Sequence, residues 1–146
     1  MDARELRIGN LVECTEIGDT YTDRVPYYGK CIFPVFSACT EFVKLNLGFG
    51  ALQKVKAHEV NPILLTDEWL IKFGLEQGGY DFLFWTKETK NGIFTICGDS
   101  EIEFGIRYNN EIELQLKYVH QLQNLYFALT GEELAITKLI HPGDFY

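Results

Sequence analysis

The feature that most constrains this fold is a period-two alternation of apolar and polar side chains between residues 80 and 117. The segments YDFLFWTK (80–87) and IFTIC (93–97) both alternate, and KETKNG (87–92) joins them. Successive side chains of a strand point to opposite faces, so each segment predicts a strand with one buried face. Asn91 and Gly92 predict a type I′ hairpin turn between these strands.

The charges of residues 101–117 predict a second hairpin with one polar and one apolar face. The polar set is Glu101, Glu103, Glu111, Glu113, Gln115 and Lys117, and the apolar set is Ile102, Phe104, Ile106, Ile112, Leu114 and Leu116. Because a one-residue slip flips a strand's faces, we expect a single register with a short loop. It places Arg107 opposite Glu111. It also places Glu101 opposite Lys117 and leaves residues 108–110 as the loop.

A short helix over residues 67–73 is predicted before these four strands. The signals at its start are Thr66 as the N-cap, Asp67 and Glu68 in the first turn, and Leu65 and Leu70 as a hydrophobic staple. Gly74 supplies the left-handed residue that ends the helix, and Leu75 closes the turn by an apolar contact. Helical spacing places Trp69, Leu70 and Phe73 on the buried face.

A second helix over residues 119–129 is predicted after the strands. Its expected buried arc contains Val119, Leu122, Leu125, Tyr126 and Leu129, and the polar residues His120, Gln121, Gln123 and Asn124 cover the other side. Thr130 and Gly131 are expected to end the helix. The order of strands, helix, four strands and helix predicts an α+β fold with the helices on one face of an antiparallel sheet.

Phe127 does not fit the apolar arc of this second helix. Its angle places its ring beside His120, Gln123 and Asn124, where it is either covered by the N-terminal sheet or offered to a partner. Cover within the chain is the favoured interpretation. If the surface is open, these four residues form the predicted binding site, with Tyr27, Tyr28 or Phe49 as further exposed rings.

The first 60 residues predict a small curled antiparallel sheet, barrel-like and similar in kind to an SH3-like barrel. Pro34 lacks an amide donor, so a strand there is expected to be an edge or broken. ALQKVKAHEV (51–60) is interpreted as a strand, with a short helix as the alternative. The expected subdomains are 1–61, rich in β structure, and 62–146, with α+β structure, unless the chain forms one compact unit.

Composition narrows the classes of function. The chain has 146 residues, is 47% hydrophobic and has a formal charge of -8, with no basic run, which disfavours nucleic-acid binding. The start, MDARELRIGN, is charged where a secretion signal needs an apolar stretch, and no run of 18 apolar residues occurs. We expect a cytoplasmic protein without membrane contact.

The reactive side chains are dispersed along the sequence. Cys14, Cys31, Cys39 and Cys97 form no CxxC pair, and the last three are expected in apolar surroundings that raise their pKa. His58 and Glu59 would point to opposite faces of a strand, and HPGD (141–144) predicts a turn. The four Glu residues of the second hairpin lack the spacing of a calcium loop. No metal, cofactor or catalytic residue is therefore predicted.

Three stretches carry a resemblance to a known family. They are ELRIGNLV (5–12), VNPILLTDEWLIKFGLE (60–76) and VHQLQNLYFALTGEEL (119–134), and they bracket nearly the whole chain. They are similar to blocks that recur in small uncharacterised proteins of bacterial genomes, often in prophage regions. The resemblance implies kinship and an origin in a mobile element, and it carries over no activity and no site residue.

Three hypotheses of function remain open on the sequence. The first is a non-enzymatic protein-binding or accessory module, because the chain is rich in rings and has no credible catalytic constellation. The second is an enzyme with a cleft between the two halves, using His58, His120 or a Cys. The third is single-stranded nucleic-acid binding by the N-terminal sheet. A sheet edge near KCIFPVF (30–36) could also pair across a homodimer.

Overall fold

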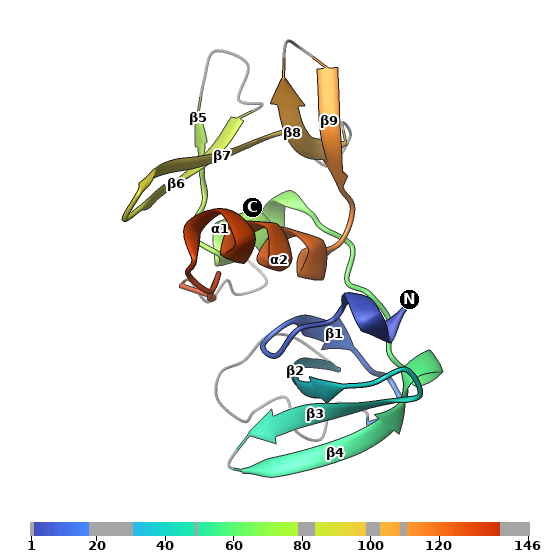
Figure 1. Ribbon diagram of the computed structural model, residues 1–146. Helices are drawn as coiled ribbons and strands as arrows, with labels where there is room; N and C mark the ends of the chain where they lie inside the picture. The colour runs from blue at the N-terminus through green and yellow to red at the C-terminus, as the bar shows by residue number, and fades with distance from the viewer. Residues whose placement is uncertain are drawn as a thin grey trace. The chain divides into compact units, whose positions relative to one another are not determined.

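The computed structural model describes residues 2–17, 31–48, 50–78, 84–98, 103–108 and 111–137. It has an α+β fold with two antiparallel sheets, of four strands in the order β1-β2-β3-β4 and of five strands in the order β5-β6-β7-β8-β9 (Figure 1). The chain divides into two compact units, Met1–Ile63 and Leu64–Tyr146. None of the described helices is long and apolar enough to span a membrane.

The first unit contains η1 (Ala3–Glu5), β1 (Leu11–Glu13), β2 (Ile32–Ala38), β3 (Phe42–Gly48), β4 (Ala51–Lys56) and η2 (Ala57–Glu59). Its core is built from alternate residues of the strands, among them Phe33, Val35, Val43, Leu45 and Val55. These side chains are at most 6% exposed, so one face of the four-stranded sheet is buried and the other faces out. Residues 18–30 and Phe49, with the predicted rings Tyr27 and Tyr28, lie outside the described residues.

Pro34 lies within β2, which runs between β1 and β3, so β2 is not an edge strand of its sheet. At Pro34 itself β2 pairs only with β1, so the expected edge is present locally. The amide of Val35 donates to the Asn10 carbonyl at 2.8 Å, on the β1 side. Amides alternate in direction along a strand, so the missing donor of Pro34 would point toward β3. Pairing between β2 and β3 begins only at Val35, opposite Leu45, and the proline therefore interrupts no ladder.

The segment 51–60 is a strand only as far as Lys56. Ala57–Glu59 form the 3-10 helix η2, so the strand interpretation is wrong for His58 and Glu59. The Glu59 carboxylate accepts a hydrogen bond from the Lys56 amide at 3.0 Å, which stabilises this tight turn at the end of the strand.

The second unit contains α1 (Asp67–Lys72), β5 (Glu76–Gly78), β6 (Phe84–Thr89), β7 (Gly92–Cys97), β8 (Phe104–Tyr108), β9 (Glu111–Leu116) and α2 (Val119–Thr130). Strand β5 was not expected, because EQG has no apolar alternation, and it extends the predicted four strands to five. Figure 1 shows the β8–β9 hairpin pointing away from β6 and β7. The β7–β8 pairing is short in the described residues, with Cys97 opposite Gly105.

The first predicted helix is confirmed, with Thr66 at the N-cap position and Phe73 at the C-cap. The amide of Leu75 donates to the Leu70 carbonyl at 3.0 Å and the amide of Gly74 to the Ile71 carbonyl at 2.9 Å. This is the hydrogen-bond pattern of a Schellman motif, and Gly74 adopts the required left-handed conformation with φ +82°. Trp69, Leu70 and Phe73 are buried, as predicted.

The turn of the first predicted hairpin lies one residue earlier than expected. Thr89 pairs with Gly92, so Lys90 and Asn91 are the two central residues. A type I′ turn needs positive φ at both central positions, but among the described non-glycine residues only Cys31 has it. The type I′ prediction is therefore wrong.

The register of the second hairpin is also corrected. The predicted register would pair Phe104 with Leu114, whereas the structure pairs Phe104 with Leu116 and Ile106 with Leu114, a difference of two residues. The apolar sets still share a face, because a shift of two residues leaves each side chain on the same side of the sheet. The register then shifts after Ile106, and Arg107 lies opposite Ile112 instead of Glu111. A bulge absorbs one residue. Glu101 and the central turn residues lie outside the described residues. The predicted pairing of Glu101 with Lys117 is therefore not described.

The second predicted helix is present as α2, which Gly131 ends with φ +73°. Its buried face differs from the expectation. His120 and Gln123 are 1% and 3% exposed, whereas Leu129 is 59% exposed. Helical spacing identifies which residues share a face, but it does not show which neighbouring groups cover that face. One group that covers His120 is the ring of Tyr118, which stacks on it with centroids 5.8 Å apart.

Candidate functional site

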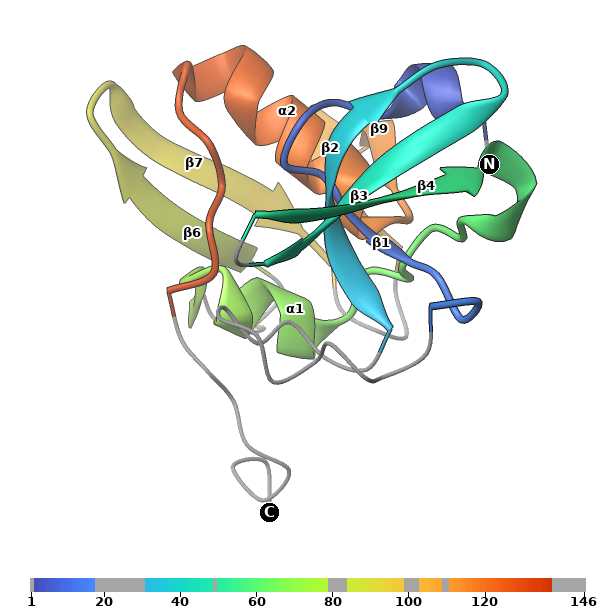
Figure 2. The same ribbon diagram turned by 90° about the horizontal axis from the view of Figure 1, so that it is seen from below.

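The second unit carries a hollow between the β6–β7 hairpin and the last turn of α2, which we call the hairpin–helix hollow. Its volume is about 320 Å³, and it is lined by residues 89 and 91–95 of the hairpin and by Leu129 and Thr130 of the helix. Figure 2 shows β6 and β7 as a paired ribbon with α2 beside it. Local hydrogen bonds in both elements shape this hollow.

On the hairpin side, the hydroxyl of Thr89 organises the turn. It donates to the Gly92 carbonyl at 2.9 Å and accepts from the Asn91 amide at 3.3 Å. Threonine side chains often satisfy turn amides in this way. Because the turn needs φ +131° at Gly92, a residue without a Cβ suits this position. These contacts fix the hairpin end that forms one wall of the hollow.

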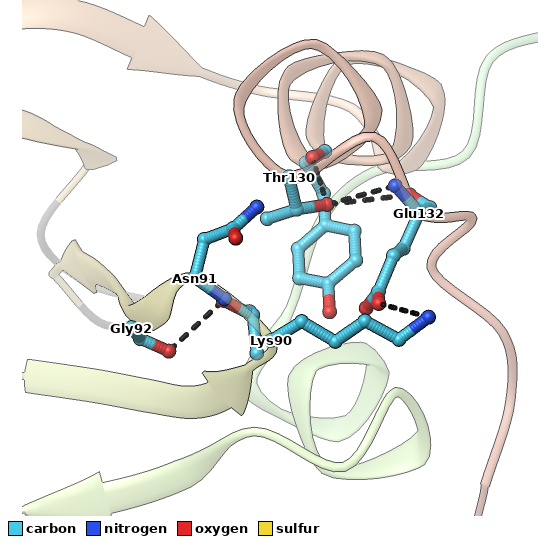
Figure 3. Close-up of polar contacts among 7 residues, drawn as sticks. Lys90, Asn91, Gly92, Thr130 and Glu132 are labelled. Atoms are coloured by element: carbon cyan, nitrogen blue, oxygen red, sulfur yellow. Dashed lines mark hydrogen bonds and ion pairs between the residues drawn. The ribbon is translucent and has the colours of Figure 1, made fainter.

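On the helix side, Thr130 has the corresponding role (Figure 3). Its hydroxyl donates to the Tyr126 carbonyl at 2.6 Å and accepts from the Glu132 amide at 3.1 Å. The amide of Gly131 donates to the Phe127 carbonyl at 2.8 Å. Local groups thus satisfy backbone carbonyls at the C-terminal end of α2, and this last turn of the helix forms the second wall of the hollow.

One ion pair and one ring contact connect the two walls. The Lys90 ammonium lies 3.5 Å from a Glu132 carboxylate oxygen, and Figure 3 shows this contact at the end of the hairpin. Lys90 is 86% exposed, so solvent screening leaves this pair worth less than about 1 kcal/mol. The rings of Phe94 and Tyr126 meet edge to face with centroids 5.0 Å apart, and this buried contact is the stronger connection.

Burial raises the pKa of the Tyr126 phenol, and the Glu132 carboxylate adds to the rise, whereas a hydrogen bond with Thr130 opposes it. The phenol is therefore neutral at ordinary pH. It contributes an apolar ring to the contact with Phe94 and no charge to the site.

The lining of the hollow is suited to binding and not to acid–base chemistry. Ile93 is 68% exposed and Leu129 is 59% exposed, and both border the hollow. Among the residues that the structure describes, the lining contains no Asp, Glu, His, Cys, Lys or Arg. The hydroxyls of Thr89 and Thr130 are engaged with backbone groups. Two accessible aliphatic side chains beside a concave surface are typical of a site that receives an apolar group.

The four predicted binding residues differ in accessibility. His120 and Gln123 are buried, Asn124 is half-buried, and Phe127 is 39% exposed. The expectation that His120 and Gln123 form the solvent side of the helix is therefore wrong. Phe127 retains accessible ring surface, and its role in binding stays a prediction.

His58 lies at a second hollow, in the first unit. This hollow measures about 390 Å³ and is lined by Thr40, Glu41, Phe42, Lys56, Ala57 and His58. The turn that carries Glu41 is held to η2, because the Ala57 amide donates to the Glu41 carbonyl at 2.8 Å. A histidine and a carboxylate therefore share an open surface, and none of the described residues that line it is a cysteine.

The cysteines do not share one environment. Cys14 and Cys97 are buried, Cys31 is half-buried and Cys39 is exposed, so the expectation of apolar surroundings is wrong for Cys39. Burial raises the pKa of the Cys14 thiol, while the backbone amides of Ile17 and Glu16 oppose this rise. Within the described residues, no group of three His, Cys, Asp or Glu side chains could hold a metal ion. The predicted turn at His141 lies outside these residues.

Comparison of the chain with protein-family models, with curated proteins and with solved structures finds no match. The function must therefore be argued from the geometry of the chain itself.

Sequence reasoning missed the hairpin–helix hollow for two reasons. IFTIC was predicted to alternate, but its outward face was not assigned: Ile93 and Phe94 point to opposite faces, and of these two only Phe94 is buried. Leu129 was assigned to the buried arc of its helix by spacing alone. Strict alternation from the buried Phe94 would have identified Ile93 as an exposed aliphatic residue next to a turn.

Proposed function

We propose that the chain is a non-enzymatic protein-binding or accessory module, and that the hairpin–helix hollow receives an apolar side chain of a protein partner. The observation that carries this proposal is the exposure of Ile93 and Leu129 on a hollow without titratable groups. Its volume of about 320 Å³ is at the lower end of the range of ligand pockets and accommodates one large side chain. Interfaces of this kind gain most of their affinity from a few buried anchors.

The surroundings of the hollow add polar groups around this apolar centre. Lys90 and Glu132 lie at its border, and their ion pair is exposed. A partner that covers the aliphatic residues can exchange hydrogen bonds with these charges at the rim. Phe127, on the same helix, is proposed as a further contact outside the hollow.

The experiment begins by finding the partner with a site-specific crosslinker. A photoreactive amino acid at position 129 should crosslink a protein that the same group at position 114 does not. Leu114 is the matched control because it is also an exposed leucine of the second unit, 46% exposed, and lies outside the hollow. The crosslinked protein, identified by mass spectrometry, is then purified and its affinity measured by calorimetry.

Leu129→Ser and Ile93→Ser should each weaken binding of that partner by about tenfold or more, as expected for a buried interface anchor. Leu114→Ser should leave the affinity unchanged, and all three variants should keep their thermal stability because the side chains are exposed. Phe127→Ala tests the further contact. Equal crosslinking from positions 129 and 114, or full affinity of both hollow variants, would contradict the proposal.

Several broader expectations are part of the same proposal. The cytoplasmic location, the mobile-element origin, the barrel-like closure of the first sheet and pairing into a homodimer stay predictions. The enzyme hypothesis has less support: the His58 hollow has no thiol in its lining, and the His120 side chain is buried.

A further inference from the structure

The outward face of strands β3 and β4 is basic, although the chain as a whole is acidic. Residues 1–63 carry seven Lys and Arg against eight Asp and Glu, a net charge of -1, whereas residues 64–146 carry six against thirteen, a net charge of -7. Most of the acidic excess therefore belongs to the second unit. Such asymmetry between halves is a recognised indication of binding to an anionic surface.

Strand pairing places three lysines on one face of the first sheet. Phe42 lies opposite Lys56, Lys44 opposite Lys54 and Asn46 opposite Leu52. Directly opposed residues of antiparallel strands share a face, and the intervening Val43, Leu45 and Val55 are buried. We call these six residues, Phe42, Lys44, Asn46, Leu52, Lys54 and Lys56, the lysine face. Figure 1 shows β3 and β4 side by side along their length.

The acidic residues nearest the lysine face lie outside its strands: Glu41 lines the hollow beside Phe42, and the Glu59 carboxylate accepts a hydrogen bond from the Lys56 amide. Strands β2, β3 and β4 contain no Asp or Glu, and Lys44, Lys54 and Lys56 are all exposed. None of the three forms an ion pair with a residue in the described part of the chain. Like charges directly opposite one another, as at Lys44 and Lys54, destabilise a sheet, and a bound anion would remove that cost.

An aromatic ring and a hollow adjoin the lysines. The Lys54 ammonium lies 4.1 Å from the centroid of the Phe42 ring, so a cation and a ring are presented together. Phe42 and Lys56 also line the hollow of about 390 Å³ that contains His58. Phe36, at the register shift of the neighbouring strand β2, is 47% exposed. Three lysines around one ring on the face of a sheet match a ligand that has both phosphates and planar groups.

We propose that the lysine face binds single-stranded nucleic acid, with phosphates on Lys44, Lys54 and Lys56 and a base on Phe42. Lysines two apart on a strand are about 6.7 Å from one another, a separation comparable to successive phosphates of an extended strand. Stacking on the ring moves the flexible Lys54 side chain from the ring to the phosphate. An acidic peptide would use the charges but would leave the ring and the adjoining hollow without a planar group.

The proposal is tested by fluorescence anisotropy with labelled dT20 and rU20, using the full chain. Binding is expected with a Kd below about 100 µM at low salt. With three phosphate contacts, the slope of log K against log salt should be about -2, since each single-strand contact contributes about -0.7. No change in anisotropy at a protein concentration of about 200 µM, twice this upper limit for the Kd, would overturn the proposal.

Two double variants separate the face from the overall charge. K44Q/K54Q should weaken binding by about tenfold or more and lower the salt slope toward about -0.7. K72Q/K117Q removes the same charge from the second unit and should leave Kd within about twofold. Equal losses in the two doubles would show that binding follows net charge and would overturn the assignment to this face.

Phe42→Leu distinguishes nucleic acid from other anions. It keeps an apolar side chain at a half-buried position and should weaken dT20 binding by about fivefold or more through lost stacking. Circular dichroism checks that Phe42→Leu folds. If Phe42→Leu is destabilised, Phe42→Tyr is measured in its place, and it should bind dT20 with the affinity of the unsubstituted chain because it keeps the ring. A labelled decaglutamate peptide or phosphatidylserine vesicles that bind as tightly as dT20, with no effect of Phe42→Leu, would overturn the proposal.

Discussion

Gly98→Ala is the substitution that most directly tests how β7 and β8 meet. Gly98 follows β7 with φ +117°, a conformation that side chains with a Cβ rarely adopt. A Cβ there would lie 2.5 Å from the Glu103 carbonyl oxygen and 2.9 Å from the Phe104 Cα. Both are backbone atoms, so no side-chain rotation can relieve the clash and the two strands must separate.

The cost follows from three contributions. Holding alanine at this φ costs on the order of 1–3 kcal/mol. Separating the strands also threatens the hydrogen bond that the Trp85 indole donates to the Gly98 carbonyl at 3.1 Å. A buried donor left without its acceptor costs about 1–3 kcal/mol, and overpacking adds about 1–3 kcal/mol. Gly92→Ala is the control, because Gly92 has φ +131° but no atom within 4 Å of an added Cβ.

The assay is urea unfolding followed by tryptophan fluorescence. Both tryptophans, Trp69 and Trp85, belong to the second unit, so the signal reports on that unit. Gly98→Ala should lose at least about 2 kcal/mol more than Gly92→Ala, which is about 1 M urea in the midpoint. Midpoints that agree between the two variants would refute the inferred clash with β8.

Gly74→Ala should also destabilise the second unit, because an added Cβ would lie 2.5 Å from the Thr137 hydroxyl oxygen, and Thr137→Ala should recover about 1 kcal/mol of this loss in a double-mutant cycle. Iodoacetamide should alkylate exposed Cys39 well before buried Cys14 in the native protein, and equal rates by peptide mass spectrometry would contradict that burial. Since burial raises the pKa of Tyr126, the folded state keeps the phenolic proton longer than the unfolded state. The resulting stabilisation should be complete below about pH 10 and be lost as pH rises through the folded pKa, and Tyr126→Phe should reduce this alkaline loss in urea titrations.

Local sequence signals predicted both α-helices, whose ends depend on local contacts, but not the β6–β7 turn or the 3-10 helix at Ala57–Glu59. The end of α1 depends on hydrogen bonds among Leu70, Ile71, Gly74 and Leu75, all within six residues, so Gly74 and its apolar neighbour were sufficient to predict it. The apolar pairing of β8 with β9 was also predictable, because alternation assigns each residue to a face. The bulge after Ile106 was not, because both registers bring the same apolar residues together.

The candidate sites depend on pairs that are distant in sequence or face outward. Ile93 and Leu129 come together only because the start of β7 lies beside the last turn of α2. The lysine face required the register of β3 against β4, which the strand interpretation of residues 51–60 did not provide. The net charge of the whole chain disfavoured nucleic-acid binding, but this single number combines two units that carry net charges of -1 and -7.

The amino-acid sequence by itself determined the α+β class, both helices and the alternation of the strands, because these follow from backbone preferences and from the free energy of burying one face. Only the tertiary structure decided that His120 and Gln123 are buried, that Leu129 is exposed and that three lysines share a face. Accessibility depends on which element covers which surface. That is a property of non-local packing, and no short stretch of sequence encodes it.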